Sequence, residues 1–218
     1  CYRNENNELV GMDIDLAREV GKRLNIEMEF KPIDWGAKEA ELKSKRIDAI
    51  WNCFTLNEER AKTYAMSDPY IKNSQLVVVP AGSDIKTIAD LKGKIVAVQD
   101  ASTGADLMEA PKNKALKDSL QDYRKYPDFA AIYMELDNKR VDAAIVDAVL
   151  ARGYYQKLKP GQYTILEESM GDEVVAVAFR KDDTEFRERV NKVMAEMKKD
   201  GTCKKISEKW MGADITNY

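Results

Sequence analysis

The stretch LKSKRIDAIWN, at residues 42–52, recurs 94 positions later as LDNKRVDAAIVD, at residues 136–147. Each copy runs from the polar end of an expected helix, through a Lys-Arg pair, into a short apolar strand that stops at a polar residue. Two matching helix-to-strand segments in one chain indicate two similar α/β lobes. Open α/β sheets bind ligands beyond the carboxyl ends of their strands, so we expect a ligand cleft between the lobes.

Composition excludes several classes of function. The chain has 218 residues, 44% hydrophobic and 33% charged, as in an ordinary globular protein, and no apolar run approaches the roughly 20 residues of a membrane span. The net charge of -3 comes from intermixed acidic and basic residues and offers no basic face to nucleic acid. We expect no nucleic-acid partner.

Histidine is absent, and Cys1, Cys53 and Cys203 lie far apart without a CxxC spacing. Zinc sites and Ser-His-Asp catalysis therefore lose their usual ligands and bases, and no metal or cofactor is expected. No signal peptide is recognisable, which fits either a cytoplasmic protein or a mature exported chain. Cys1 is a poor candidate for a lipid-bearing cysteine, because the apolar segment that follows it leaves little room for a polar linker.

Hydrophobic periodicity extends the two repeats into two series of helices and strands. In the first lobe it predicts a strand at residues 9–11, a helix capped by Asp13, a strand at residues 26–33, a helix at residues 36–46 and a strand at residues 47–51. In the second lobe it predicts a strand at residues 95–98, a helix that starts near Ser102, a helix after Pro127 and a strand at residues 141–146. A long helix and a short helix that ends near Trp210 complete the chain. This order implies parallel pairing and an α/β fold.

Two β-rich runs, at residues 75–80 and 174–179, carry the chain between the lobes. The first lobe is predicted to comprise residues 1–78 and 178–218, and the second, inserted lobe residues 79–177. Two crossing strands form a hinge that lets two lobes close around a small molecule.

Residues 52–60 follow the first repeat strand and end at Arg60. A guanidinium forms a planar fork that matches a carboxylate, so Arg60 is a candidate anion anchor. Taken alone, Arg60 is better explained as part of a solvated run of charges with Glu58, Glu59 and Lys62.

Three residues of the second lobe suggest a complementary site. Ser102 and Thr103 stand at an expected helix N-terminus, which favours anions, although an ordinary helix cap explains them better when they are taken alone. Asp147 ends the second repeat strand and is equally suited to pair with an ammonium group or to cap a helix at residues 148–156. Together with Arg60 these residues complement an α-amino acid zwitterion. Trp35 is a candidate aromatic wall for its side chain, whereas Trp51 fits the core better.

Several motifs, in order along nearly the whole chain, resemble the bacterial extracellular solute-binding proteins of the polar amino-acid class, which include lysine/arginine/ornithine, histidine and glutamine binders. They are GMDIDLA at residues 11–17, IDAI at 47–50 through Arg60, SDPY at 67–70, LKGK at 91–94, STG at 102–104, RKDD at 180–183, and DGT at 200–202 through Trp210. The resemblance implies a two-lobed type II periplasmic-binding fold, located outside the cytoplasm or lipid-anchored. Its expected partners are a polar L-amino acid and the membrane permease of an ABC importer, and we expect a monomer.

The resemblance also implies roles for individual residues. Arg60 corresponds to the clamp on the ligand α-carboxylate, with Thr55, Ser102 and Thr103 completing its shell. Asp147 corresponds to the partner of the α-amino group, helped by the Cys53 carbonyl.

For the ligand side chain the resemblance implies three contacts: Trp35 stacks along it, Asn52 faces it, and Gln99 is a weaker candidate. The chain departs from the family pattern in two ways: it starts after the usual first strand, and Cys53 replaces a serine or glycine. No second carboxylate is obvious beside Trp35, so glutamine, arginine and cystine all remain candidate ligands.

Two other classes of function remain open. Cyclohexadienyl dehydratases resemble this family, and such chemistry needs a general acid, for which Glu168 and Glu173 are the nearest candidates. No sequence pattern places either glutamate in the cleft, so we expect no enzyme. A ligand-sensing domain of a larger receptor is the third alternative.

Overall fold

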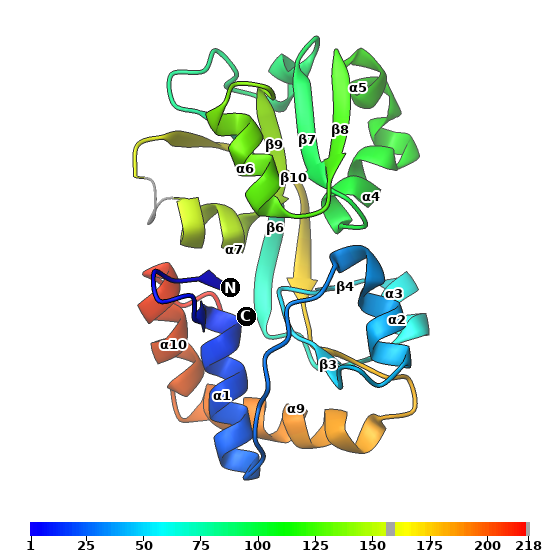
Figure 1. Cartoon of the computed structure of the whole chain (residues 1–218), viewed down its shortest axis with the longest axis vertical. Coiled ribbons are helices and arrows are strands. Elements are labelled where there is room, and N and C mark those ends of the chain that lie inside the picture. Colours follow the sequence, from blue (N-terminus) through cyan, green and yellow to red (C-terminus); the bar gives the residue numbers. More distant parts are fainter. Residues whose placement is uncertain (156–159, 217–218) are drawn as a thin grey trace. The chain divides into compact units, whose positions relative to one another are not determined.

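Both copies of the repeat fold into a helix, a turn and a strand in the computed structural model, which describes residues 1–155 and 160–216 (Figure 1). The first copy contains α2 (Lys38–Lys43) and β3 (Ala49–Ile50), and the second contains α6 (Phe129–Asp137) and β9 (Ala143–Asp147). In the turns, Lys45 and Lys139 adopt the left-handed conformation, with φ of 60° and 57°. A left-handed residue reverses the chain after a helix, so the two copies turn into their strands in the same way.

The polar contacts around the two turns are equivalent as well. The backbone N–H of Arg46 donates to the Glu41 carbonyl at 3.1 Å, and that of Arg140 donates to the Glu135 carbonyl at 2.9 Å. The same two pairs form ion pairs through their side chains, at 3.0 Å and 3.1 Å. The basic residue in each repeat therefore stabilises the turn between helix and strand.

Spatial contacts between residues divide the chain into two compact units. Unit 1 comprises Cys1–Ile33, Ala37–Lys72 and Val174–Tyr218, and unit 2 comprises Asp34–Gly36 and Asn73–Glu173. The chain enters unit 2 within β6 (Ile71–Pro80) and leaves it within β10 (Tyr163–Val175). The predicted lobe boundaries, at residues 78 and 178, lie further along the chain than these two passages.

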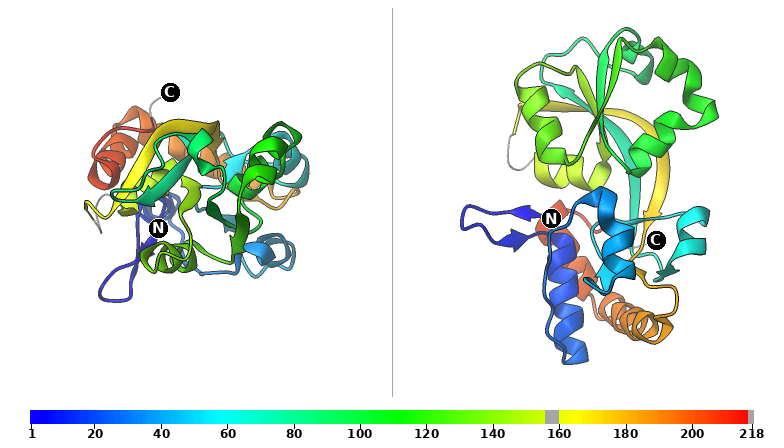
Figure 2. Two further views of the ribbon diagram at one scale, coloured as in Figure 1. Left: turned by 90° about the horizontal axis from the view of Figure 1, so that it is seen from above. Right: turned by 45° about the vertical axis from the view of Figure 1, so that its right-hand side comes forward.

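Unit 2 contains most of a mixed sheet with the strand order β4-β10-β6-β9-β7-β8. Figure 2 shows strands and helices of this unit from two further directions. The sheet's further members are β4 (Thr55–Leu56), which belongs to unit 1, β7 (Ile95–Gln99) and β8 (Asp122–Tyr126). β7 pairs in parallel with β8 and β9, as the strand-helix-strand order predicts, whereas β6 runs antiparallel to β9. The helices of this unit are α4 (Thr103–Glu109), α5 (Lys114–Ser119), α6 and α7 (Ala148–Leu150), with short turns at Ile88–Leu91, Pro111–Asn113 and Ala151–Tyr155.

Successive strand residues point to opposite faces of this sheet and form two separate cores. One face packs Val96, Val98 and Ile145 against Met108 of α4. The other packs Ala97, Ala144 and Val146 against Ile132 and Leu136 of α6. Because both faces are covered by helices, these strands are apolar throughout, as is usual for parallel sheets.

Unit 1 contains a small sheet with the order β3-β11-β5 and a hairpin at the start of the chain. Its strands are β1 (Tyr2–Arg3), β2 (Leu9–Val10), β5 (Ala65–Met66) and β11 (Ala178–Phe179). Its helices are α1 (Met12–Leu24), α2, α3 (Glu58–Thr63), α9 (Thr184–Lys199) and α10 (Thr202–Met211). In the 3-10 turn before α2, at Trp35–Ala37, the first two residues group with unit 2 and Ala37 groups with unit 1. β11 is antiparallel to both β3 and β5 and forms the central strand, so a strand from after unit 2 joins the two strands of unit 1 that precede it in the sequence.

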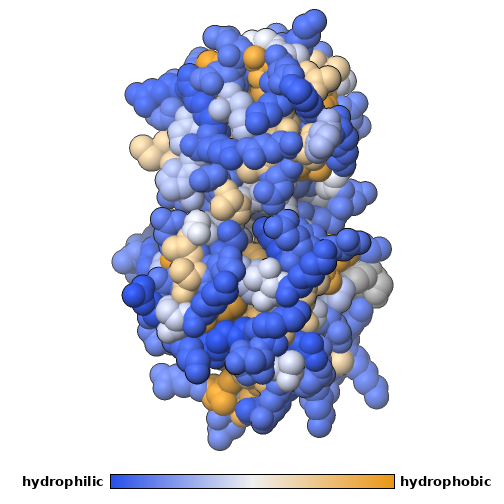
Figure 3. All heavy atoms as spheres, turned by 90° about the vertical axis from the view of Figure 1, so that its right-hand side faces the viewer, coloured by the Kyte–Doolittle hydropathy of each residue, from blue (hydrophilic) through white to orange (hydrophobic). Residues whose placement is uncertain are grey.

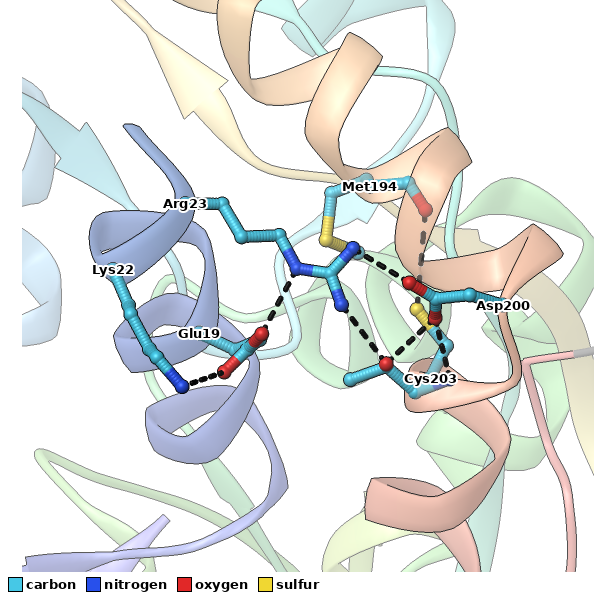
Figure 4. A network of polar contacts seen from close by, with 7 residues as sticks. Glu19, Lys22, Arg23, Met194, Asp200 and Cys203 are labelled. Atoms are coloured by element: carbon cyan, nitrogen blue, oxygen red, sulfur yellow. Dashed lines mark hydrogen bonds and ion pairs between the residues drawn. The ribbon is translucent and has the colours of Figure 1, made fainter. Parts of the chain in front are cut away.

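Arg23 joins α1 to the turn between α9 and α10 (Figure 4). Its guanidinium donates to Glu19 at 2.9 Å, to Asp200 at 2.7 Å and to the Thr202 hydroxyl at 3.0 Å. Hydrogen bonds from Thr202 and Arg23 lower the pKa of Asp200 to about 2. Nearby, burial raises the pKa of the Cys203 thiol to about 11, which makes it a packing residue and a poor nucleophile.

Two predictions about the start of the chain are wrong. Asp13 does not cap α1, because the helix begins after Gly11 and Asp13 is a buried residue of its first turn. No strand forms at residues 26–33, although the exposure of successive residues alternates there as predicted. Among the residues that the structure describes, no other strand pairs with this segment. An alternating pattern produces a strand only where a partner supplies the hydrogen bonds.

The surface seen in Figure 3 is mostly hydrophilic, with hydrophobic residues in small separate groups. Among the described residues, Met134 of α6 is the exposed large hydrophobic side chain, at 64% exposure. Within that part of the chain, every helix is too short or too polar to cross a membrane.

Candidate functional site

Arg60 is held at one position by the residues just before it. α3 is capped by Asn57, whose side-chain oxygen accepts from the Arg60 backbone N–H at 2.8 Å. The Arg60 guanidinium donates to the Thr55 carbonyl at 3.1 Å and stacks on the ring of Phe54, 4.1 Å from its centroid. Arg60 is therefore half-buried and fixed beside Thr55, which argues against a solvated run of charges.

The loop before Thr55 is shaped by Asp13. Cys53 adopts φ of 53°, and its backbone N–H donates to one Asp13 carboxylate oxygen at 2.8 Å. The other oxygen accepts from the Tyr70 hydroxyl at 2.7 Å. Burial, followed by the Asp13 carboxylate, raises the pKa of Tyr70 well above its usual range, so this hydroxyl remains a donor. Asn52 lies beside this loop, is exposed, and accepts a contact from the Cys1 thiol at 3.1 Å.

The polar residues after β7 hold the start of α4. The Ser102 hydroxyl accepts from the Ala105 backbone N–H at 3.2 Å and donates to the Gln99 carbonyl at 2.7 Å. Ser102 is thus the helix cap that the sequence allowed as its simpler explanation. The Gln99 side chain is buried and donates to the Pro127 carbonyl at 3.1 Å, at the carboxyl end of β7.

Asp147 lies where β9 ends, and its side chain makes no capping bond to the helix that follows. One of its oxygens accepts from the side-chain amides of Asn73 and Gln75, at 2.8 Å each. The Gln75 amide also contacts the Thr103 hydroxyl at 3.3 Å, so Gln75 links two of the predicted site residues. Of the two roles that the sequence left open for Asp147, the side-chain cap is therefore excluded.

Gly104 lets the start of α4 approach Gln75. A Cβ at this position would lie 3.0 Å from the Gln75 side-chain oxygen, and within 3.3 Å of Val98 and Ile145. Any larger residue would push α4 away from β6 and β9. The STG motif thus contains one residue that caps the helix, one that contacts Gln75 and one that permits the contact.

A second carboxylate, Glu173 of β10, shares the amide donors of Asp147. The side-chain amides of Asn73 and Gln75 both donate to Glu173, the latter at 2.9 Å. Burial and the charge of Glu173 raise the pKa of Asp147 to about 7, against the opposing hydrogen bond from Asn73. A carboxyl group whose pKa is raised toward neutral pH is a common feature of functional sites.

Sequence reasoning missed Asn73 and Gln75 and could not place Glu173. A signal was available for the first two: they are two residues apart in IKNSQLVVVP, so they share one face of an otherwise apolar strand. No local pattern places Glu173, because its partners are distant in the sequence. Trp35 lies half-buried in the 3-10 turn before α2, and its contacts group it with unit 2.

Residues 1–213 match the family model of the bacterial extracellular solute-binding proteins, family 3. The chain is 35% identical to the L-cystine-binding protein TcyJ of Escherichia coli (strain K12) over 219 residues, covering 99% of this chain and 79% of the relative. The chain belongs to this family, and the resemblance predicted from its motifs is confirmed.

Solved structures agree with this assignment. A substrate-binding protein of an ABC uptake transporter from Streptococcus pneumoniae, with bound histidine, is 33% identical with a TM-score of 0.93, covering 100% of this chain and 89% of that one. An ancestral arginine-binding protein bound to glutamine is 39% identical with a TM-score of 0.87, covering 97% of this chain and 92% of that one. The predicted periplasmic-binding fold is confirmed by these matches.

Proposed function

We propose that this chain is the substrate-binding receptor of an ABC importer for a polar L-α-amino acid, and that it has no enzymatic activity. The observation that carries the proposal is the state of Asp147, a half-buried carboxylate at a strand end that is held by two side-chain amides and not used as a helix cap. The relatives named above bind cystine, histidine, arginine or glutamine, which supports a ligand of this class.

Arg60 is the proposed partner of the ligand α-carboxylate. The bond to the Thr55 carbonyl and the stacking on Phe54 fix the plane of its guanidinium before any ligand arrives. A fixed donor loses less conformational entropy on binding than a mobile arginine would. Thr55, Ser102 and Thr103 complete the proposed carboxylate shell, and Ser102 acts there chiefly by fixing the start of α4.

Asp147 is the proposed partner of the ligand ammonium group, with Cys53 contributing its carbonyl. Trp35, Asn52 and Gln99 remain proposed contacts of the ligand side chain. Glutamine, arginine and cystine are the proposed ligands. We further propose that the protein acts outside the cytoplasm, as a monomer, and delivers its ligand to a membrane permease.

One observation supports the proposal that the chain is not a dehydratase. Glu168, one of the two candidate acids, accepts from the backbone N–H of Ile88 at 2.8 Å, which gives it a structural role in unit 2. Glu173 is better placed, but as a neighbour of Asp147 it fits an amino-group site. We expect no turnover of prephenate.

The test is thermal unfolding in the presence of single amino acids, including ornithine and cystine, and of prephenate. A ligand that binds only the folded state stabilises it by RT ln(1 + [L]/Kd), so we expect a clear shift with one or two polar amino acids and none with prephenate. Arg60→Ala should weaken binding by about 2–5 kcal/mol, because it leaves a carboxylate without its partner. Arg189→Ala, at an exposed position of α9, is the matched control. Near-native affinity in Arg60→Ala would remove Arg60 from the site.

A further inference from the structure

Asp147 and Glu173 compete for the same hydrogen-bond donors. The amide group of Asn73 donates to both carboxylates, and so does that of Gln75. Each amide NH2 carries two hydrogens, so these bonds engage both donor groups fully. The two carboxylates therefore share one set of neutral donors.

We propose that Glu173 is a positioning residue of the amino-group site, which makes the Asp147–Glu173 pair hold one proton until the ligand ammonium displaces it into solvent. This inference rests on the proposed amino-acid-binding function. It adds a residue to the site and couples ligand binding to proton release.

The surroundings of the pair provide little positive charge. β6 contributes the neutral Asn73 and Gln75 toward Asp147, β7 contributes the neutral Gln99 at its end, and α7 contributes no titratable side chain. The titratable side chains nearest along β6, α4 and β10 are Lys72, Asp106 and Asp172, and Arg152 follows α7; all four are exposed. Glu173 is thus the charged group that acts most strongly on Asp147.

Two neighbouring, half-buried carboxylates that share the same neutral donors cannot both ionise at low cost, so one proton is retained by the pair. The rise in the pKa of Asp147 to about 7, caused first by burial and next by Glu173, agrees with this. The proton belongs to the pair and not to either residue alone. A bound ammonium group supplies the missing positive charge, so the second carboxylate ionises and one proton passes to the buffer.

The consequence is an affinity that depends on pH. Ligand affinity should rise by about tenfold between pH 6 and pH 8, the effect of one pKa unit of coupling, with uptake of a proton by the buffer. Glu173→Gln keeps the shape of the side chain but leaves Asp147 as a single carboxylate. In that variant burial still raises the pKa of Asp147 but the charge of Glu173 is gone, so the affinity should change less over the same interval than in the wild type.

Calorimetric titration at pH 6, 7 and 8, in two buffers of different ionisation enthalpy, measures affinity and proton release together. L-arginine, L-glutamine and L-cystine are the probes, and Glu167→Gln, an exposed position on the same strand, is the matched control. We expect pH-dependent affinity and proton release in the wild type and in the control, and a weaker pH dependence with less proton release in Glu173→Gln. Equal pH dependence in the wild type and Glu173→Gln would overturn the proposal while leaving the amino-acid-binding function intact.

A measurement without ligand separates the inference about Glu173 from the proposed amino-acid-binding function. Between pH 5 and pH 8, the free energy of unfolding should fall with rising pH more steeply in the wild type than in Glu173→Gln, because the charge of Glu173 adds to the burial that already raises the pKa of Asp147. Parallel stability curves would overturn the inference about Glu173 whether or not any amino acid binds.

Discussion

Asp13→Ala should destabilise the protein more than most single substitutions, because this buried carboxylate holds two donors. It accepts from the Cys53 backbone N–H at 2.8 Å and from the Tyr70 hydroxyl at 2.7 Å. A hydrogen bond to a charged group contributes about 1.5–3 kcal/mol, so losing both predicts about 3–6 kcal/mol. Alanine is a good helix former, so little of this loss should come from α1 itself.

Urea unfolding measures the effect as a change in midpoint at constant slope. Tyr70→Phe removes one of the two bonds and should cost about 1.5–3 kcal/mol, and Asp182→Ala, at an exposed position, serves as the matched control. A loss below about 1 kcal/mol in Asp13→Ala would refute the claim that Asp13 fixes the loop at Cys53. If that claim is right, ligand affinity should fall in Asp13→Ala as well, because the same loop leads to Thr55 and Arg60.

Three further predictions concern other parts of the molecule. The pKa of Asp147 is raised from 3.8 to about 7, so between these pH values the folded state binds more protons than the unfolded state. The free energy of unfolding should therefore fall as the pH rises from about 4 to about 7, by at most roughly 4 kcal/mol. Chemical denaturation across that range checks this, and an equal fall in Asp147→Asn would contradict it. Gly104→Ala should lower the free energy of unfolding by about 1–2 kcal/mol, because the added Cβ crowds its neighbours. Gly171→Ala should lower it less, because a Cβ there would meet only ordinary contacts at 3.4 Å. Similar losses in the two variants would count against the close approach of α4 to Gln75. Mass-spectrometric thiol labelling of the native protein should modify the exposed Cys1 and spare the buried Cys203 until unfolding, and equal rates would disprove its burial.

The sequence predicted most of the helix and strand order because the apolar periodicity and the repeat were strong. It identified β7, α4, α6 and β9 to within a few residues, since each buries a regular face. It failed at residues 26–33, where the local pattern was correct but pairing depends on a partner elsewhere in the chain.

For the site, local sequence gave residue types but not their partners. Ser102 was predicted as a cap and is one, because capping is a contact between residues three apart. The roles of Asp13 and Glu173 depend on residues distant in the sequence, such as Tyr70 and Asn73, and only the fold brings these together. The binding roles of Arg60 and Asp147 remain predictions.

The central claim, that this chain binds an α-amino acid through Asp147, is tested most directly by calorimetry with a matched pair of ligands. The polar L-amino acid that stabilises the protein most is compared with its des-amino analogue, on the wild type and on Asp147→Asn. We predict that the wild type binds the amino acid far more tightly than the analogue, and that Asp147→Asn loses this preference. Equal affinity of the wild type for both ligands, or an unchanged preference in Asp147→Asn, would contradict the claim.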